Sequence, residues 1–187
     1  MTNHLFRLTA AILVVGALSF GARAFAAPGG FQEDFLGQLG DVEKKLMSLE
    51  EAMPPAKMTW RPDKGVRSVS EVYLHVAFGN YGFLKSIGID PPADAGMSSD
   101  AAKWDTKTTD KAEIKKVLEK SFEHVRTSVK AIPDAELDQK IKLFGKFDMT
   151  KRAALIALIA HINEHLGQSI AYARTNKVAP PWSKKGS

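Results

Sequence analysis

The sequence predicts an all-α protein, a four-helix bundle with a long loop between its second and third helices. Four segments repeat apolar residues every three or four positions, which is the spacing of a helix that buries one face. No segment alternates apolar and polar residues convincingly enough to predict a sheet. The 187 residues fit a single domain with a real core, and the long loop favours one crossover rather than short connections throughout.

The first helix is expected at residues 31–53. Its apolar residues follow in alternating steps of four and three, so they form one stripe that faces a core. Pro54 and Pro55 come directly after the stripe and end the helix, because proline has no backbone N–H to donate. The stripe consists of Phe31, Phe35, Leu39, Val42, Leu46, Leu49 and Met53.

The second helix is expected at about residues 69–87. Ser68 or Ser70 is placed to cap it, and Glu71 then lies in its first turn, where a negative charge is favourable. The third helix is expected from about residue 109 or 110 to residue 131, and Pro133 ends it. Its buried face is predicted to hold Ile114, Leu118, Phe122 or Val125, Val129 and Ile132.

Two connecting segments differ in length and composition. Residues 88–109 are rich in Pro, Gly, Ser, Asp and Thr and contain Trp104 outside any helical stripe, which predicts a long surface loop. Residues 134–150 are expected to form a connector with a hairpin-like piece around Gly145. The long loop is also a candidate for shaping the mouth of a binding pocket.

The last helical segment, within residues 152–182, carries the clearest chemical signal. Its apolar stripe ends where Pro180 and Pro181 forbid further helix. His161 and His165 lie one turn apart and within roughly 40° of each other on one face, the spacing that one metal ion needs. A hydrogen-bonded pair of core histidines is the competing interpretation, and a metal would need a third ligand from elsewhere in the chain.

His75 is the other histidine on a core-facing stripe, in the second helix. Gly79 and Gly82 share its face, although each glycine costs a helix about 1 kcal/mol relative to alanine. Close helix packing and space kept open beside a ligand both explain two such glycines. His124 lies beside the stripe of the third helix and is predicted to be a surface residue.

Residues 161–165 also fit the H-x-x-E-H pattern of inverted zinc peptidases, in which the glutamate is a general base. Glu164 lies roughly 80° from the centre of the two histidines, so it is poorly placed for that role. Those peptidases also take a ligand from far downstream, whereas only 22 residues follow His165. The third ligand is therefore expected upstream, at His75.

Composition restricts the chemistry. Cysteine is absent, so disulfides, thiolate ligands and cysteine nucleophiles are excluded, and a metal must be held by histidine, carboxylate or amide oxygen. The formal net charge is +5, but basic and acidic residues are interspersed apart from Lys184 and Lys185. The charge pattern therefore gives no support to nucleic-acid binding.

Residues 1–26 are expected to be a signal peptide and residues 27–187 the mature bundle domain. Arg7 precedes a continuous apolar run that is too short to span a membrane well, and Ala24-Phe25-Ala26 resembles a cleavage site. Cleavage would remove Arg7 and Arg23 and lower the formal charge from +5 to +3. We expect a periplasmic or secreted bacterial protein with no stable membrane association after cleavage; an uncleaved anchor is the alternative.

The order and spacing of these features over residues 31–182 resemble the DinB-like (DinB/YfiT) superfamily of metal-dependent four-helix-bundle proteins. The matching features are Trp60-Arg61-Pro62, Ser68-Val69-Ser70-Glu71 and His75, then His161 and His165, then Gly167-Gln168, Tyr172, Arg174 and Pro180-Pro181. The resemblance implies that His75, His161 and His165 converge on one divalent metal ion in the bundle interior. Zinc, nickel and iron all occur in that family.

The resemblance also implies a range of functions. Characterised members of the family transfer thiol cofactors or isomerise maleylpyruvate with a thiol, and the family name, which refers to DNA damage, implies no DNA chemistry. Three histidines leave a coordination position open, as in a catalytic site. Tyr172 and Gln168, and less strongly Glu71 and Glu164, are candidates to orient the histidine rings.

We therefore expect an exported metal-dependent hydrolase or transferase that acts on an unidentified small molecule. The export signal weakens the thiol-transfer interpretation, because low-molecular-weight thiols are mainly cytosolic. The alternatives are a non-catalytic metal-binding or stress-related bundle, and a bundle whose histidines bind nothing. A homodimer formed through bundle helices is also expected, since this architecture often dimerises.

Overall fold

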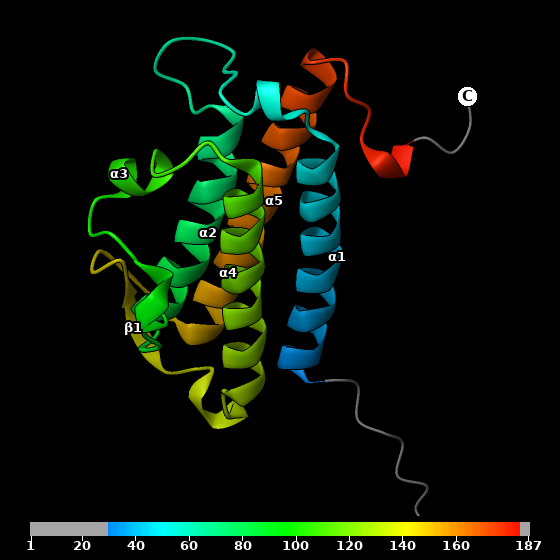
Figure 1. Ribbon diagram of the computed structural model, residues 1–187. Helices are drawn as coiled ribbons and strands as arrows, with labels where there is room; N and C mark the ends of the chain where they lie inside the picture. The colour runs from blue at the N-terminus through cyan, green and yellow to red at the C-terminus, as the bar shows by residue number, and fades with distance from the viewer. Residues whose placement is uncertain (1–29, 184–187) are drawn as a thin grey trace, which may run out of the picture.

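The computed structural model describes residues 30–183, whose regular secondary structure is helical except for one small hairpin (Figure 1). The four long helices are α1 (Phe31–Ala52), α2 (Val69–Ser86), α4 (Lys111–Ala131) and α5 (Lys151–Thr175). A short helix, α3 (Ala101–Asp105), lies between α2 and α4 in the sequence, and strands β1 (Lys140–Leu143) and β2 (Phe147–Thr150) lie between α4 and α5. Single-turn 3-10 helices are found at Pro55–Lys57, Ala93–Ala95, Asp134–Glu136 and Pro181–Ser183.

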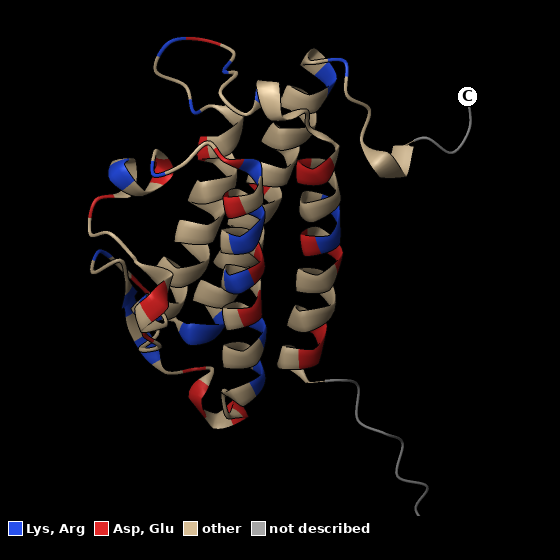
Figure 2. Cartoon of the chain, in the orientation of Figure 1, with Lys and Arg blue, Asp and Glu red and all other residues tan. Residues whose placement is uncertain are grey.

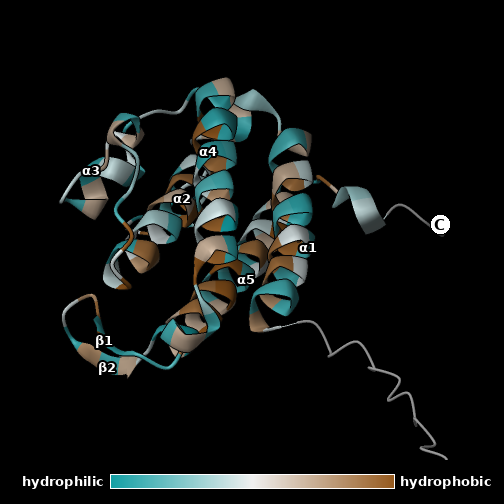
Figure 3. Cartoon of the chain, turned by 90° about the horizontal axis from the view of Figure 1, so that it is seen from below, coloured by the Kyte–Doolittle hydropathy of each residue, from teal (hydrophilic) through white to brown (hydrophobic). Residues whose placement is uncertain are grey.

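The long helices form a four-helix bundle, as the sequence predicted. Helix α1 packs against α4 and α5, and α2 packs against the same two helices, so α1 and α2 lie diagonally across the bundle (Figure 3). Helices α1 and α2 are consecutive in the sequence but are therefore not neighbours in the bundle. The segment 53–68 has to cross one end of the bundle to join them.

The predicted apolar stripes form the core. Every stripe residue of α1 from Phe35 onward is buried, and in α4 both Phe122 and Val125 are buried, which resolves the two alternatives. In α5, Leu155, Ile162 and Leu166 are buried. Each large side chain taken out of water in this way contributes about 1.5–3 kcal/mol, so the packed faces hold the helices together.

Side chains cap the N-termini of three long helices. The hydroxyl of Ser68 accepts from the N–H of Glu71, whose carboxylate accepts from the N–H of Ser68 at 2.9 Å, so the two form a capping box at the start of α2. Glu71 also pairs with Arg61 at 2.6 Å. Asp110 caps α4 and Thr150 caps α5. These contacts fix where the histidine-bearing helices begin.

The segment 88–109 differs from the predicted surface loop. Trp104, on α3, is buried, with 1% of its surface exposed, and its indole N–H donates to the carbonyl of Leu74 on α2 at 2.8 Å. The ring of Tyr81 meets that indole edge-on at 6.2 Å between centroids. Helix α3 has only five residues, too few to show an apolar period, so the sequence could not reveal that it is anchored to α2.

The hairpin expected around Gly145 is present. Strands β1 and β2 pair antiparallel, and Phe144 and Gly145 at the tip both have positive φ, 52° and 71°. The ring of Phe144 packs edge-on against Phe83 of α2 at 4.9 Å, and its N–H donates to the hydroxyl of Ser86 at 3.1 Å. The hairpin tip is thereby docked against α2.

Acidic and basic residues are interspersed along α1 and α4 (Figure 2). None of the helices within residues 30–183 combines the length and the apolar character needed to cross a membrane. The predicted signal peptide, residues 1–26, lies outside the described residues.

Candidate metal centre

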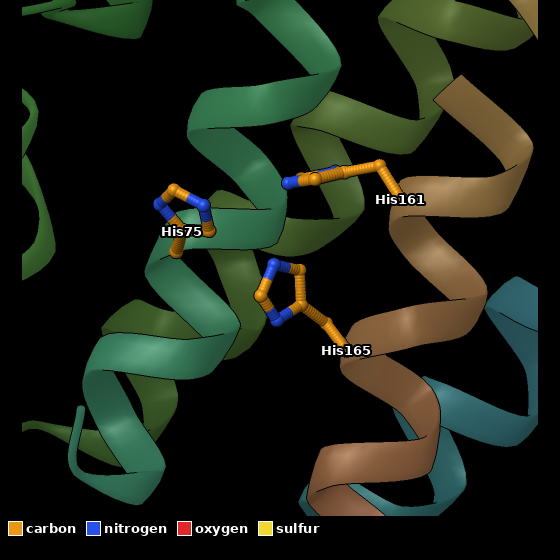
Figure 4. Close-up of side chains that lie close together, drawn as sticks. All are labelled: His75, His161 and His165. Carbon is orange, nitrogen blue, oxygen red and sulfur yellow. The ribbon is translucent and has the colours of Figure 1, made fainter. Parts of the chain in front are cut away.

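The three predicted histidines lie together between α2 and α5. Figure 4 shows the ring of His75 on α2 facing the rings of His161 and His165 on α5. One nitrogen of each ring lies within 4.8 Å of the corresponding nitrogens of the other two. The ring centroids are 4.6–5.3 Å apart. The helical repeat of α5 alone places His161 and His165 on one face, and the packing of α2 against α5 then brings His75 to them.

Gly79, one turn after His75, makes room for the ring of His161. A Cβ atom at this position would lie 2.8 Å from Nδ1 of His161 and closer still to Cε1, which no real side chain tolerates. The sequence left open whether Gly79 serves packing or a ligand. The histidine ring itself fills the space, so Gly79 serves the close approach of α2 to His161.

A chain of hydrogen bonds orients His165. Nδ1 of His165 lies 2.9 Å from Oε1 of Gln168, the Gln168 amide donates to the hydroxyl of Tyr172 at 2.8 Å, and that hydroxyl donates to the carbonyl of Arg67 at 3.1 Å. A carbonyl oxygen can only accept, so the Tyr172 hydroxyl donates to it and accepts from the Gln168 amide. The Gln168 side-chain oxygen then accepts from His165. His165 therefore carries its hydrogen on Nδ1 and leaves Nε2 free toward the other histidines. Tyr172 and Gln168, two of the candidates for orienting the histidine rings, are thus both part of this chain.

The orienting group beside His75 is Asp105, which the sequence analysis missed. Oδ2 of Asp105 lies 3.3 Å from Nδ1 of His75 and accepts from Nε of Arg67 at 2.8 Å. Burial opposes ionisation of Asp105, but His75 and Arg67 together outweigh it and hold the pKa of this carboxyl below its usual range. A carboxylate beside Nδ1 is the usual arrangement behind a metal-binding histidine, since it leaves Nε2 for the ion.

Burial also determines the charge of the histidines on α5. It lowers the pKa of His161 to about 3, with further contributions from His165, His75 and Arg67. Burial likewise lowers the pKa of His165, against a smaller opposing effect of the bond to Gln168. Both rings are therefore neutral at neutral pH, which is the form that binds a metal.

These donors fit a divalent ion. Three nitrogens bound tetrahedrally to zinc at about 2.1 Å lie about 3.4 Å apart, which small rotations of the rings reach from their present separation. Nδ1 of His161 is buried and has no hydrogen-bond partner among the described residues, and Nδ1 of His75 has only the 3.3 Å approach to Asp105, so the polar atoms of the cluster are not fully satisfied as it stands. The cluster is not sealed, because 18% of the His75 side chain is exposed.

The other sequence candidates lie elsewhere. Glu71 caps α2 and pairs with Arg61, so its carboxylate is already used. Glu164 is exposed, as its angle on the helix predicted, which disfavours the role of an inverted-peptidase base. His124, predicted to be a surface residue, is half-buried against the ring of Tyr81 at 5.5 Å, so that prediction was wrong. Tyr81 lies on α2, so this contact depends on the packing of α2 against α4 and not on spacing within α4.

Comparison with solved structures places the fold. A DinB-like protein from Bacillus cereus ATCC 10987 is 17% identical, with a TM-score of 0.67 over 80% of this chain and 95% of that one. YfiT from Bacillus subtilis, described as a probable metal-dependent hydrolase with an unusual four-helix bundle topology, is 18% identical. Its TM-score is 0.63, over 79% of this chain and 89% of that one. At these identities the likeness establishes the fold alone.

The sequence comparisons give the family. No curated protein matches the chain. Residues 38–169, which include all three clustered histidines and most of the bundle, match the sequence profile of the DinB superfamily. The match extends over most of the chain and agrees with the four-helix architecture of the structural neighbours. The chain belongs to the DinB superfamily.

Proposed function

We propose that the protein holds one divalent metal ion on His75, His161 and His165 and acts as a metal-dependent hydrolase or transferase. The observation that carries the proposal is the convergence of three imidazole nitrogens within 4.8 Å of one another. Two of the rings have their outer nitrogen beside a protein group, at Asp105 and Gln168, so their inner nitrogens are directed at a common point. The metal is zinc, nickel or iron, all of which imidazole binds.

Three neutral ligands leave a divalent ion its full charge and an open position, so that it supplies Lewis-acid activation of water or of a carbonyl group. The chain's own residues prepare this position. Gln168 holds the hydrogen on Nδ1 of His165, and Asp105 stands beside Nδ1 of His75. Burial keeps His161 uncharged, and its ring is fixed in the space left by Gly79.

A hydrolase is favoured over a thiol transferase. The fold shared with YfiT, itself described as a probable metal-dependent hydrolase, supports the first. We also propose that residues 1–26 direct export and are removed, which would take the protein away from the cytosolic thiols that a transferase uses. Mass spectrometry of protein from the periplasmic fraction tests this: a mass beginning at Ala27 or Pro28 is expected, and a full-length chain in the membrane fraction would contradict it.

Activity measurements test the proposed function. Zinc-, nickel- and iron(II)-loaded protein is screened against aryl esters, phosphate esters, amides and thiol acceptors. We expect turnover in one metal form that disappears with a chelator and in His161→Ala, and that persists in His124→Ala, which removes a histidine outside the cluster. Rates no higher than the uncatalysed background in every loaded form, with the metal demonstrably bound, would instead favour a non-catalytic metal-binding bundle. Light scattering on the same samples measures whether the predicted homodimer forms.

A further inference from the structure

Arg67 is fixed between the groups that orient two of the clustered histidines. Its carbonyl accepts from the hydroxyl of Tyr172, at the end of the chain that begins at His165. Its Nε donates to the same Asp105 oxygen that lies beside His75. Both ends of the residue are therefore held against the site. The guanidinium group lies at the outer edge of the His75 ring, one carboxylate oxygen away from it.

The terminal nitrogens of Arg67 are unused. Within residues 30–183, neither Nη1 nor Nη2 has a hydrogen-bond acceptor, and 39% of the side chain is exposed. The arginines that form ion pairs elsewhere in the bundle behave differently: Arg61, Arg126 and Arg152 each place at least one terminal nitrogen on a protein oxygen. Arg67 thus presents a planar pair of donors to solvent while its Nε keeps it in place.

The charge distribution favours an anion at this position. The three imidazoles carry no charge when they act as ligands, and the single carboxylate of Asp105 faces His75 as well as Arg67. A guanidinium group stays charged at every accessible pH, and its fork matches the two oxygens of a carboxylate or phosphate.

We propose that Arg67 is a substrate-binding residue that recognises a carboxylate or phosphate group, so that the substrates of this protein are small organic anions. The inference rests on the proposed function, since it assigns the substrate class of the same site. The ion pair with Asp105 uses only Nε of Arg67, so both terminal nitrogens remain available to a ligand. Because the guanidinium is already held by Asp105, little side-chain entropy is lost when the anion binds.

Isothermal titration of zinc-loaded protein with acetate and with methyl phosphate tests the inference. The two anions distinguish a carboxylate from a phosphate substrate, and neutral acetamide is the control ligand. We expect Arg67→Met to weaken binding of the preferred anion by about 10- to 100-fold, the effect of losing a charge-assisted fork. Arg174→Met removes an exposed arginine nine residues beyond His165, about 13 Å along α5, and should bind like the parent.

Arg67→Lys is a second variant in case Arg67→Met fails to fold. Lysine can still pair with Asp105 but has no planar fork, so the Arg67→Lys protein should bind the anion several-fold more weakly than the parent. Equal affinity in the parent and in folded Arg67 variants, or no anion binding by the zinc-loaded parent, would overturn the inference. Zinc content is measured in every sample. Absence of zinc from the parent defeats the proposed function, and anion binding by that metal-free protein, dependent on Arg67, would still support this assignment of Arg67.

Discussion

The ring of His161 occupies the space that a side chain at Gly79 would fill. A Cβ atom there would lie 2.8 Å from Nδ1 of His161. His161 on α5 can therefore take its position only because residue 79 on α2 has no side chain. Gly82, one turn closer to the hairpin, has no such role. A Cβ atom at Gly82 would meet Cε1 of Phe144 at 3.5 Å, an ordinary van der Waals contact.

Gly79→Ala and Gly82→Ala should therefore have opposite effects. Alanine at position 79 displaces the ring of His161, and the overpacking costs about 1–3 kcal/mol, more than the roughly 1 kcal/mol that alanine adds to helix stability. Its zinc affinity should fall at least tenfold. Alanine at position 82 should stabilise the protein by up to about 1 kcal/mol and leave zinc affinity unchanged.

Urea unfolding and competition with a chromophoric zinc chelator measure the two effects. Parent-like zinc affinity in Gly79→Ala would show that His161 does not depend on this space. Reduced stability in Gly82→Ala would show that the packing of the hairpin tip on α2 is tighter than the 3.5 Å separation indicates.

Asp105→Asn should weaken zinc binding by about 10- to 100-fold, the usual effect of removing a group behind a metal ligand. The amide removes the negative charge that faces Nδ1 of His75 and loosens the hold on Arg67. Chelator competition measures the affinity. Asp94→Asn is the matched control, because Asp94 pairs with Lys120 on the surface and is mostly exposed. Equal affinity in the two variants would contradict the orienting role of Asp105.

Glu50 predicts a pH dependence that is independent of the metal. Its carboxylate is fully buried in the bundle, and neither oxygen has a hydrogen-bond partner among the described residues. Burial raises its pKa above the ordinary value of 4.5, against the smaller effect of Lys111 and Lys115. A carboxyl whose pKa is raised on folding stabilises the fold most below the unfolded pKa, and this contribution is lost as the pH rises through the folded pKa.

Glu50→Gln should therefore make metal-free protein more stable than the parent at pH 8, by about 1–2 kcal/mol, because an unpaired buried charge is removed. The difference should shrink below pH 4.5, where Glu50 is itself neutral. Urea unfolding at the two pH values gives the comparison, and Glu51→Gln, one position further along α1 and exposed, controls for the change of formal charge. A stability difference that is the same at both pH values would disprove the assigned cause.

Much of this arrangement follows from local sequence patterns. The apolar stripes predict the long helices, and the four-residue spacing of His161 and His165 predicts that they share a face. His75 could be added because its stripe faces the core. Tyr172 and Gln168 were identifiable because one or two helical turns separate them from the pair, so their positions depend only on α5.

The residues that sequence reasoning missed depend on contacts between distant segments. Asp105 reaches His75 only because its neighbour Trp104 is buried against α2. A five-residue helix is too short to show an apolar repeat, so the sequence does not predict this burial. Glu71 was a reasonable orienting candidate by spacing, but its carboxylate is used by the capping box and by Arg61. The role of Gly79 required knowing which side chain of α5 lies opposite.

The most direct test of the three-histidine site is the metal content of the protein, purified without a histidine tag. His75→Ala and His165→Ala each remove one ligand, and His124→Ala removes a histidine of α4 outside the cluster. A three-histidine site predicts about one equivalent of zinc, nickel or iron in the parent and in His124→Ala, and little in the other two variants. A parent that holds no metal after reconstitution with all three ions, or cluster variants that retain it fully, would contradict the three-histidine site.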